Sequence, residues 1–429
     1  MAKRINVVTM GCSKNLVDSE LFLSQMVANG YEVVHDGEIA DARIVAVNTC
    51  GFILDAKEES INSILEFVAA KNRGEIDKIF VFGCLTERYK DDLIREIPEV
   101  DGFYGKFQVR KMVSDLHAEY RMSLSHQRYQ TTPSHYAYLK ISEGCNRQCS
   151  YCAIPRMTGK HKSIPMEDLV AEATSLASQG VKELLVIAQD LSYYGIDLYK
   201  EQKLGELTQK LAGLPGIEWI KLHYAYPAKF PYDLLPVMRE NENVAKYLDI
   251  ALQHCSDNLL KIMRRNITKA ETIALVERIR EEVPGIHIRT TLLVGHPGET
   301  EEDFEELKQF VRDMRFERLG VFPYSHEEDT YAGETFKDTI PQEVKEGRAQ
   351  EIMAIQQEIA FEINRQKIGS QMKVVIDRKE EEYFIGRTEF DSPEVDGEVL
   401  IHGKNLVTGQ FYQVKITDAE EFDLYGEIV

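Results

Sequence analysis

Three cysteines lie close together in the middle of the chain and could bind a metal. Cys145, Cys149 and Cys152 follow a C-x3-C-x2-C spacing. The N-terminal residues do not predict a secretion signal, so metal binding is favoured over a disulfide. Three thiolates suit a 4Fe-4S cluster and leave one iron free to bind a molecule from outside. Zinc would normally take a fourth Cys or His nearby, but His161, the nearest candidate, fits no usual zinc spacing. A structural metal knuckle is therefore the weaker alternative.

Three further cysteines each follow a short run of β-forming residues. They are Cys12, Cys50 and Cys84, after the runs Ile5–Met10, Arg43–Asn48 and Lys78–Phe82. Because the carboxyl ends of parallel strands meet at one edge of a sheet, we expect the three thiols to converge there. Chance burial of cysteine is the alternative. We interpret the three as a second cluster site with its own open iron, and the seventh cysteine, Cys255, as an apolar filler.

Residues 1–130 are predicted to form an α/β domain around these three strands. Helical patterns at Leu16–Asn29 and Asp55–Lys71 separate the β-rich runs. Strands that alternate with helices imply a parallel sheet with right-handed crossovers. A polar, basic stretch near residues 121–134, which includes Thr131-Thr132-Pro133, is interpreted as the linker to the next domain.

Residues 131–368 repeat the alternation of strand and helix six times. The expected strands are Tyr136–Ile141, Glu183–Ala188, Trp219–Tyr224, Tyr247–Leu252, His287–Val294 and Arg318–Pro323. Six such units predict an open (β/α)6 barrel whose chemistry lies at the carboxyl ends of the strands. The loop with Cys145 follows the first strand, as this rule requires. A long helical pattern at Pro341–Ile368 closes the domain, and Pro341 suits a first helical turn.

Residues 369–429 have a different pattern. Short alternating strands lie between Gly, Asp and Pro turns, which predicts a small antiparallel β-barrel. Residues 367–429 contain seven Lys and Arg against fourteen Asp and Glu. A surface that binds RNA is normally basic, so this composition favours a basic protein as the partner.

The whole chain is also acidic. Its 429 residues include 71 Asp and Glu against 51 Lys and Arg, a net charge of −20 at pH 7. This charge disfavours a nucleic-acid substrate, although a local basic groove is compatible with an acidic total. No apolar run approaches the ~18 residues needed to cross a bilayer. Cysteine-rich metal sites without an export signal predict a cytoplasmic protein that does not enter a membrane.

The segment Gly144–Cys152 resembles the signature of the radical S-adenosylmethionine (SAM) enzymes, including Tyr151 before the last cysteine. With the strand-end cysteines, the whole chain resembles the radical SAM methylthiotransferases, which have an N-terminal three-cysteine domain, a radical SAM domain and a C-terminal TRAM domain. Residues 11–20 and 152–163 are most similar to the RimO branch, which modifies an aspartate of the twelfth small-subunit ribosomal protein. The MiaB branch, which modifies an adenosine in tRNA, typically has Gln-Met where this chain has Ser13-Lys14.

This resemblance implies the cofactors and the residues that hold them. Two 4Fe-4S clusters are expected, one to bind SAM and one to hold exchangeable sulfur, together with an external electron donor and a sulfur source. Their implied ligands are the two triplets, Cys145, Cys149 and Cys152 for the first and Cys12, Cys50 and Cys84 for the second. Contacts to SAM or substrate are implied for Tyr151, Gln189, Asp190, Gln253, Arg289 and Gly295. No catalytic side chain beyond the cluster ligands is expected, because removing hydrogen from an unactivated carbon requires a cofactor.

Two other functions remain open at this point. A tRNA adenosine methylthiotransferase would have the same fold and cofactors, but Ser13-Lys14 and the acidic C-terminal domain argue against it. A non-catalytic iron–sulfur protein would carry clusters without cleaving SAM. The sequence therefore favours methylthiolation of an aspartyl residue in a basic ribosomal protein.

Overall fold

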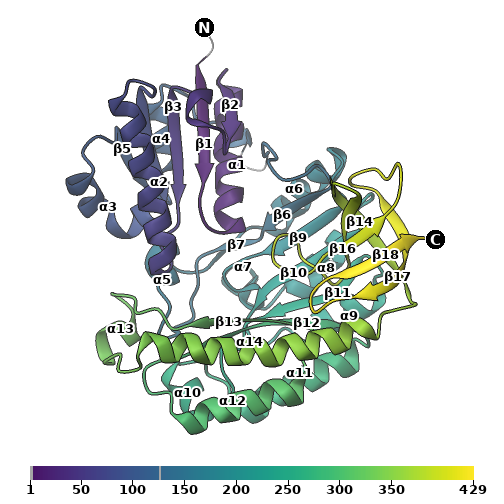
Figure 1. Ribbon diagram of the computed structural model, residues 1–429. Helices are drawn as coiled ribbons and strands as arrows, with labels where there is room; N and C mark the ends of the chain where they lie inside the picture. Colours follow the sequence, from purple (N-terminus) through teal and green to yellow (C-terminus); the bar gives the residue numbers. More distant parts are fainter. Residues whose placement is uncertain (1–2, 125–126) are drawn as a thin grey trace.

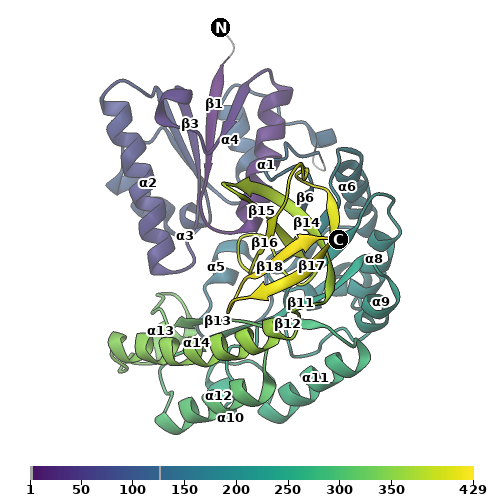
Figure 2. The ribbon, with the colours of Figure 1, turned by 45° about the vertical axis from the view of Figure 1, so that its right-hand side comes forward.

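The computed structural model describes residues 3–124 and 127–429, which fold into three successive units (Figures 1 and 2). Two residues of the expected linker, Ser125 and His126, lie outside the described residues. Within the described part of the chain, no helix is long and apolar enough to cross a membrane. The predicted fold class, two α/β units followed by a small β-barrel, is confirmed.

The first unit is a five-stranded parallel sheet in the order β2-β1-β3-β4-β5. The strands are β1 Arg4–Thr9, β2 Glu32–His35, β3 Ile44–Thr49, β4 Lys78–Gly83 and β5 Gly102–Gly105. The helices are α1 Ser13–Ala28, α2 Leu54–Asn72, α3 Cys84–Glu96 and α4 Val109–Asp115. Alternate residues of the central strands face opposite ways, so α1 and α4 cover one face and α2 and α3 the other.

The second unit is an open sheet of six parallel strands in the order β13-β12-β11-β10-β9-β6. The strands are β6 Tyr136–Lys140, β9 Glu183–Ile187, β10 Trp219–Ala225, β11 Val244–Ile250, β12 His287–Val294 and β13 Arg318–Pro323. Helices pack on its outer face, among them α6 Met166–Ser178, α8 Leu204–Ala212, α11 Lys269–Glu282 and α12 Glu301–Met314. All six expected strands are present, and the sheet order follows the chain as in an open (β/α)6 barrel.

The third unit is a closed barrel of five strands in the order β14-β15-β16-β18-β17. The strands are β14 Gln371–Glu380, β15 Tyr383–Thr388, β16 Val399–His402, β17 Phe411–Ala419 and β18 Leu424–Ile428. Four of the pairings are antiparallel, but β16 and β18 pair in parallel. An odd number of strands cannot alternate in direction around a closed ring, so one parallel pair is unavoidable.

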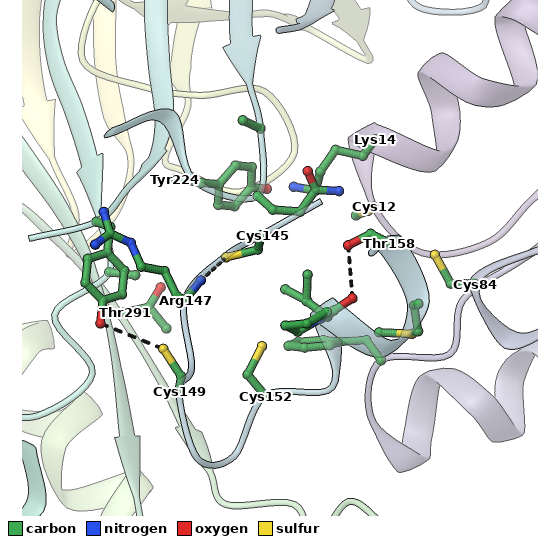
Figure 3. Close-up of a pocket in the computed structure, with 18 of the residues that line it drawn as sticks. Cys12, Lys14, Cys84, Cys145, Arg147, Cys149, Cys152, Thr158, Tyr224 and Thr291 are labelled. Carbon is green, nitrogen blue, oxygen red and sulfur yellow. Dashed lines mark hydrogen bonds between the residues drawn. The ribbon is translucent and has the colours of Figure 1, made fainter. Parts of the chain in front are cut away.

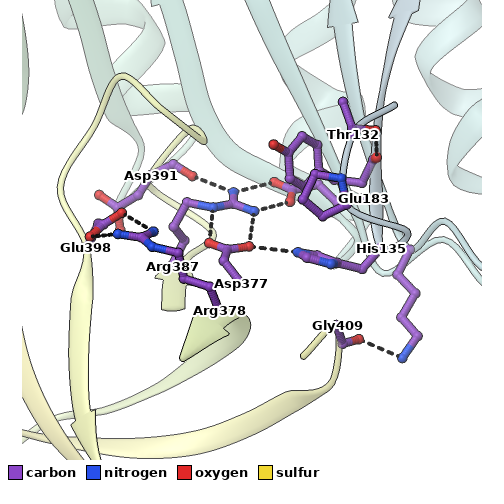
Figure 4. A network of polar contacts seen from close by, with 12 residues as sticks. Thr132, His135, Glu183, Asp377, Arg378, Arg387, Asp391, Glu398 and Gly409 are labelled. Carbon is purple, nitrogen blue, oxygen red and sulfur yellow. Dashed lines mark hydrogen bonds and ion pairs between the residues drawn. The ribbon is translucent and has the colours of Figure 1, made fainter. Parts of the chain in front are cut away.

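A buried ion-pair network joins the third unit to the second (Figure 4). Arg387 makes two hydrogen bonds to the Glu183 carboxylate, at 3.0 and 2.8 Å, and two more to Asp377. His135 Nε2 lies 2.7 Å from Asp377 Oδ1, and Lys221 Nζ lies 2.8 Å from Glu183 Oε1. These contacts hold the C-terminal barrel against the amino ends of the neighbouring strands β6, β9 and β10.

Some elements differ from the sequence prediction. The strands β2 and β5 and the helices α3 and α4 were not expected, and Cys84, which follows β4 as predicted, is the first residue of α3. The long helix α14 covers Gln342–Arg365, with Pro341 at the N-cap position just before its first turn. The strands β2 and β5 contain only four residues each, which leaves too little alternation to identify them by pattern.

Candidate functional site

The three N-terminal cysteines lie at the carboxyl ends of three adjacent strands, as predicted. Cys12 follows β1, Cys50 follows β3 and Cys84 follows β4, and these strands pair as β1-β3-β4. Parallel strands in register therefore bring residues 38 and 34 positions apart in sequence to one edge of the sheet.

The chain leaves space between these thiols. Gly11 has a φ of +89°, and a Cβ at this position would lie 2.9 Å from Cys50 Sγ. Only glycine combines this backbone conformation with such a close approach. Asn15, in the first turn of α1, donates hydrogen bonds from Nδ2 to the carbonyls of Met10 and Thr49, and its Oδ1 lies 3.6 Å from Cys84 Sγ. Asn15 thus ties together two of the strand ends that carry the cysteines.

The second triplet lies on the loop between the short strand β7 Ser142–Glu143 and the helix α5 Ile154–Thr158. The loop begins at Gly144, whose φ is +82° and where a Cβ would lie 2.3 Å from the Lys160 carbonyl oxygen. Its middle is fixed by the Ser150 amide, which donates to the Met263 carbonyl at 3.0 Å. These constraints hold the C-x3-C-x2-C segment at the carboxyl end of the six-stranded sheet.

Both triplets line one cavity of about 390 Å³ between the first and second units. Figure 3 shows Cys12 and Cys84 on one side of it and the loop with Cys145, Cys149 and Cys152 on the other. Within residues 3–124 and 127–429, no three His, Cys, Asp or Glu side chains are close enough to share a single metal ion. In an iron–sulfur cluster each thiolate binds a different iron, so the three thiols of a triplet need not meet at one point.

The residues around the second triplet fit an anionic group. The Arg265 guanidinium is buried and donates from Nη1 to Cys149 Sγ at 3.5 Å and to Tyr151 Oη at 3.4 Å. Its Nη2 donates to the Ala251 carbonyl, and its Nε has no hydrogen-bond partner in the described part of the chain. A buried guanidinium without a carboxylate needs another negative charge, which thiolates bound to a cluster would provide.

Burial acts on the pKa of one thiol in each triplet, Cys84 and Cys145. Burial raises the pKa of Cys84 to about 12, although the Lys106 ammonium acts in the opposite direction. Burial also raises the pKa of Cys145 to about 12, and the Arg147 amide opposes this shift. A metal bound by these two thiols would therefore displace their protons.

Three of the residues expected to contact SAM or substrate line the cavity: Tyr151, Gln189 and Gln253. Gln189 donates from Nε2 to Glu143, while its buried Oε1 has no partner among the described residues. Gln253 has a φ of +72°, and its backbone bonds to Thr291 and Leu293 of the adjacent strand β12. Gln189 therefore presents an unused acceptor, and Gln253 is held in a backbone conformation that is rare for residues other than glycine.

The other three, Asp190, Arg289 and Gly295, are not among the residues that line the cavity. Asp190 instead binds Arg147, which does line it, with Nε 2.7 Å from Oδ2. The Arg289 guanidinium lies 3.2 Å from Asp396 of the C-terminal barrel and 3.7 Å from Asp249. The structure therefore gives Arg289 ion-pair partners within the chain. Cys255 is fully buried in the hydrophobic core of the second unit.

Sequence reasoning missed several residues that line the cavity, among them Lys106, Asp249 and Arg265, and it used Lys14 only as a marker of the RimO branch. The side chain of Asp249, on β11, points to the same side of the sheet as Ala251, just beyond the strand. Burial raises the pKa of Asp249 to about 6, although the Arg289 guanidinium acts in the opposite direction. No local pattern marks these positions. The alternation along β10 and β11 could at most have shown which residues face inward.

Comparisons with known proteins divide the chain in the same way. Residues 4–105 match the uncharacterized protein family UPF0004, residues 139–311 match the Radical SAM superfamily, and residues 368–429 match the TRAM domain. Among solved structures, the radical SAM methyltransferase TsrM from Kitasatospora setae is similar with a TM-score of 0.58 and 14% identity, over 78% of this chain and 74% of that one. The cobalamin-dependent radical enzyme OxsB is similar with a TM-score of 0.52 and 13% identity, over 82% and 56%. These two likenesses concern the fold alone.

Relatives with much higher identity extend along the whole chain. The ribosomal protein uS12 methylthiotransferase RimO of Bacteroides thetaiotaomicron is 61% identical over 429 residues, which is 100% of this chain and 98% of the relative. The protein of the same name from Porphyromonas gingivalis is 59% identical over 429 residues, 99% of each chain. With this identity along its full length, the chain belongs to the RimO family of radical SAM methylthiotransferases.

Proposed function

We propose that this protein methylthiolates the β-carbon of an aspartyl residue in ribosomal protein uS12, with SAM and two 4Fe-4S clusters as cofactors. The observation that carries the proposal is that two separate cysteine triplets line one cavity. A radical generated at one metal site and sulfur held at the other would then meet the same substrate atom. The names of the full-length relatives support uS12 as the substrate.

The residues of the cavity are assigned roles accordingly. Cys145, Cys149 and Cys152 would hold the cluster that binds SAM, and Cys12, Cys50 and Cys84 the cluster that holds sulfur. When bound, the cofactors supply the radical chemistry that removes hydrogen from an unactivated carbon and the groups that replace it.

The protein itself would position these groups and exclude water. Arg265 would neutralise part of the negative charge at Cys149, and the free Oε1 of Gln189 would accept a hydrogen bond from the amine of SAM. Tyr151 and Gln253 would complete the wall on the SAM side. None of the other three residues, Asp190, Arg289 and Gly295, lines the cavity. They would act only through the residues that do line it.

A protein substrate fits the charge of the molecule. The net charge of −20, and the excess of Asp and Glu in residues 367–429, would attract a basic ribosomal protein and repel RNA. The reaction also needs an electron donor and a sulfur source from outside the chain, and it would take place in the cytoplasm, where cysteines stay reduced.

The test uses reconstituted holoenzyme, SAM and a reductant, with purified uS12 and bulk tRNA supplied together. We expect 5′-deoxyadenosine to form and the mass of uS12 to rise by one methylthio group, while the tRNA nucleosides stay unchanged. Methylthiolation of a tRNA adenosine with unmodified uS12 would instead identify a tRNA enzyme. Absence of 5′-deoxyadenosine would identify a non-catalytic iron–sulfur protein.

A further inference from the structure

The cavity that holds the two triplets must also accept the side chain of the substrate. This inference rests on the proposed function, in which that side chain is an aspartate and is ionised at neutral pH. A carboxylate that leaves water for a partly enclosed cavity needs a cation or several hydrogen-bond donors there. Four cationic side chains line the cavity: Lys14, Lys106, Arg147 and Arg265.

Three of these cations already have partners. Lys106 Nζ lies 3.0 Å from Asp18 and 3.4 Å from Glu143. Arg147 is paired with Asp190 at 2.7 Å. Arg265 donates to Cys149 Sγ and to the Ala251 carbonyl. Lys106 and Arg147 are thus paired with carboxylates, and Arg265 is directed at the second cysteine triplet, where a bound cluster would supply the negative charge that it lacks.

Lys14 is different. Its ammonium lies 3.5 Å from the centre of the Tyr224 ring, which is a cation–π contact. Among residues 3–124 and 127–429, Lys14 Nζ makes no hydrogen bond or ion pair, and the Asp249 carboxylate of the same cavity interacts with it only through the electrostatic field. The ring covers one side of the ammonium and cannot take up its hydrogen-bonding capacity, so the donors of a half-buried Lys14 remain available.

The position of the Tyr224 ring is itself constrained. Tyr224 lies near the end of β10 with a φ of +70°, a conformation that is uncommon for residues other than glycine. Such strain persists only where the surrounding structure enforces it, and it concentrates at functional sites. Here it accompanies the contact between Tyr224 of the second unit and Lys14 of the first (Figure 3).

The sequence position of Lys14 places it beside the sulfur-holding site. It is the second residue of α1, two positions after Cys12. A carboxylate bound by Lys14 would therefore bring the adjoining carbon close to the thiols of the first unit. We propose that Lys14 binds the side-chain carboxylate of the target aspartyl residue and so selects an aspartate over its neutral isostere asparagine.

The experiment measures binding, without turnover. Reconstituted holoenzyme is saturated with SAM in the absence of reductant, and its Kd is measured for uS12 and for uS12 with the target aspartate changed to asparagine. The target is the residue that carries the added mass in the reaction of the wild-type enzyme. We expect the wild-type enzyme to bind the aspartate form about tenfold more tightly, as for one hydrogen bond between charged groups.

Three enzyme variants complete the comparison. Lys14→Met keeps the length of the side chain and removes its charge, so the ratio of the two Kd values should fall to about one. Lys14→Arg keeps the charge and should retain most of the ratio. Lys78→Met removes an exposed lysine at the opposite end of β4 and should leave the ratio unchanged. Because each ratio compares two substrates on one enzyme preparation, partial loss of folded protein does not alter it.

The outcomes separate this inference from the proposed function. A wild-type enzyme that modifies uS12 but binds both forms equally would overturn the role of Lys14 alone. So would a Lys14→Met enzyme that keeps the full ratio. A wild-type enzyme that neither binds nor modifies uS12 would overturn the proposed function, and the role of Lys14 with it.

Discussion

Arg265 Nη1 donates a hydrogen bond to Cys149 Sγ across 3.5 Å, and the two residues are 116 positions apart in sequence. The guanidinium is buried, and its other contacts are neutral: the Tyr151 hydroxyl, the Ala251 carbonyl and the face of the Tyr226 ring. A buried cation aimed at a thiolate stabilises added negative charge at that sulfur. Arg265 would therefore make a cluster held by Cys149 easier to reduce.

The first prediction concerns this reduction potential. Replacing Arg265 with Met removes the positive charge and one hydrogen bond to Cys149, both of which favour the reduced cluster. We expect the midpoint potential to fall by about 60 mV, the equivalent of a tenfold change for one electron. An anaerobic redox titration followed by EPR measures this midpoint potential. The titration uses protein in which Cys12, Cys50 and Cys84 are changed to Ala, so that only one cluster contributes to the signal. An unchanged potential would mean that Arg265 has a packing role only.

A second prediction separates the two triplets. Changing Cys12, Cys50 and Cys84 together to Ala should halve the iron bound per chain, because one of two clusters is lost. The variant should still release 5′-deoxyadenosine but should no longer methylthiolate uS12. The matching change of Cys145, Cys149 and Cys152 should also halve the iron and should abolish 5′-deoxyadenosine. If the N-terminal variant is the one that stops cleaving SAM, the assignment of the two sites is reversed.

The sequence predicted that each cysteine triplet comes together, because each prediction depends on a local pattern. Strand ends in an open parallel sheet and a close C-x3-C-x2-C spacing can both be read without knowing any tertiary contact. The contacts of Arg265 and Lys14 could not be predicted in this way, since their partners are remote in sequence. Arg289 shows the same limit. Arg289 and Thr291 are two residues apart on β12, so their side chains point to the same side of the sheet. Thr291 lines the cavity, whereas the Arg289 guanidinium pairs with Asp396.

A third prediction concerns an ion-pair contact between the first and second units, which carry the two triplets. Asp18 of α1 binds Lys140 of the second unit and Lys106 of the first. Burial alone would raise the pKa of Asp18, but the two ammonium groups outweigh it and lower that pKa. Changing Asp18 to Asn leaves both lysines with only Glu143 and should cost about 3–5 kcal/mol, as for a broken buried ion pair.

The functional readout is the number of uS12 molecules modified per 5′-deoxyadenosine formed. This yield should fall in the Asp18→Asn enzyme, because the sulfur site shifts relative to the radical site. Asp92→Asn, which breaks an exposed pair with Arg95 on the same unit, is the control and should leave the yield unchanged. A yield equal to that of the wild type in both variants would show that this contact does not align the sites.

The fourth prediction concerns pH and the attachment of the C-terminal barrel. Burial would raise the pKa of Glu183, but Arg387 and Lys221 outweigh it and lower that pKa to about 2, from an ordinary 4.5. A depressed carboxyl pKa stabilises the folded state above the unfolded pKa, and the contribution is lost as pH falls from about 4.5 toward 2. The shift corresponds to about 3 kcal/mol.

Thermal unfolding of the wild type and of Glu183→Gln between pH 7 and pH 4 tests this. The difference in Tm should be constant from pH 7 to 5 and shrink below about pH 4.5. Glu218→Gln, which breaks an exposed pair between Glu218 and Lys373 of the same two units, should change Tm little at any pH. A difference in Tm between the wild type and Glu183→Gln that grows as the pH falls would contradict the assignment of a negative charge to Glu183.

The most direct test of the central claim is the intact mass of uS12 purified from cells that lack this protein. The account predicts that uS12 loses the mass of one methylthio group, that the gene restores it, and that versions lacking either cysteine triplet do not. A uS12 that keeps the methylthio group in these cells, while a tRNA nucleoside loses its own, would contradict the account.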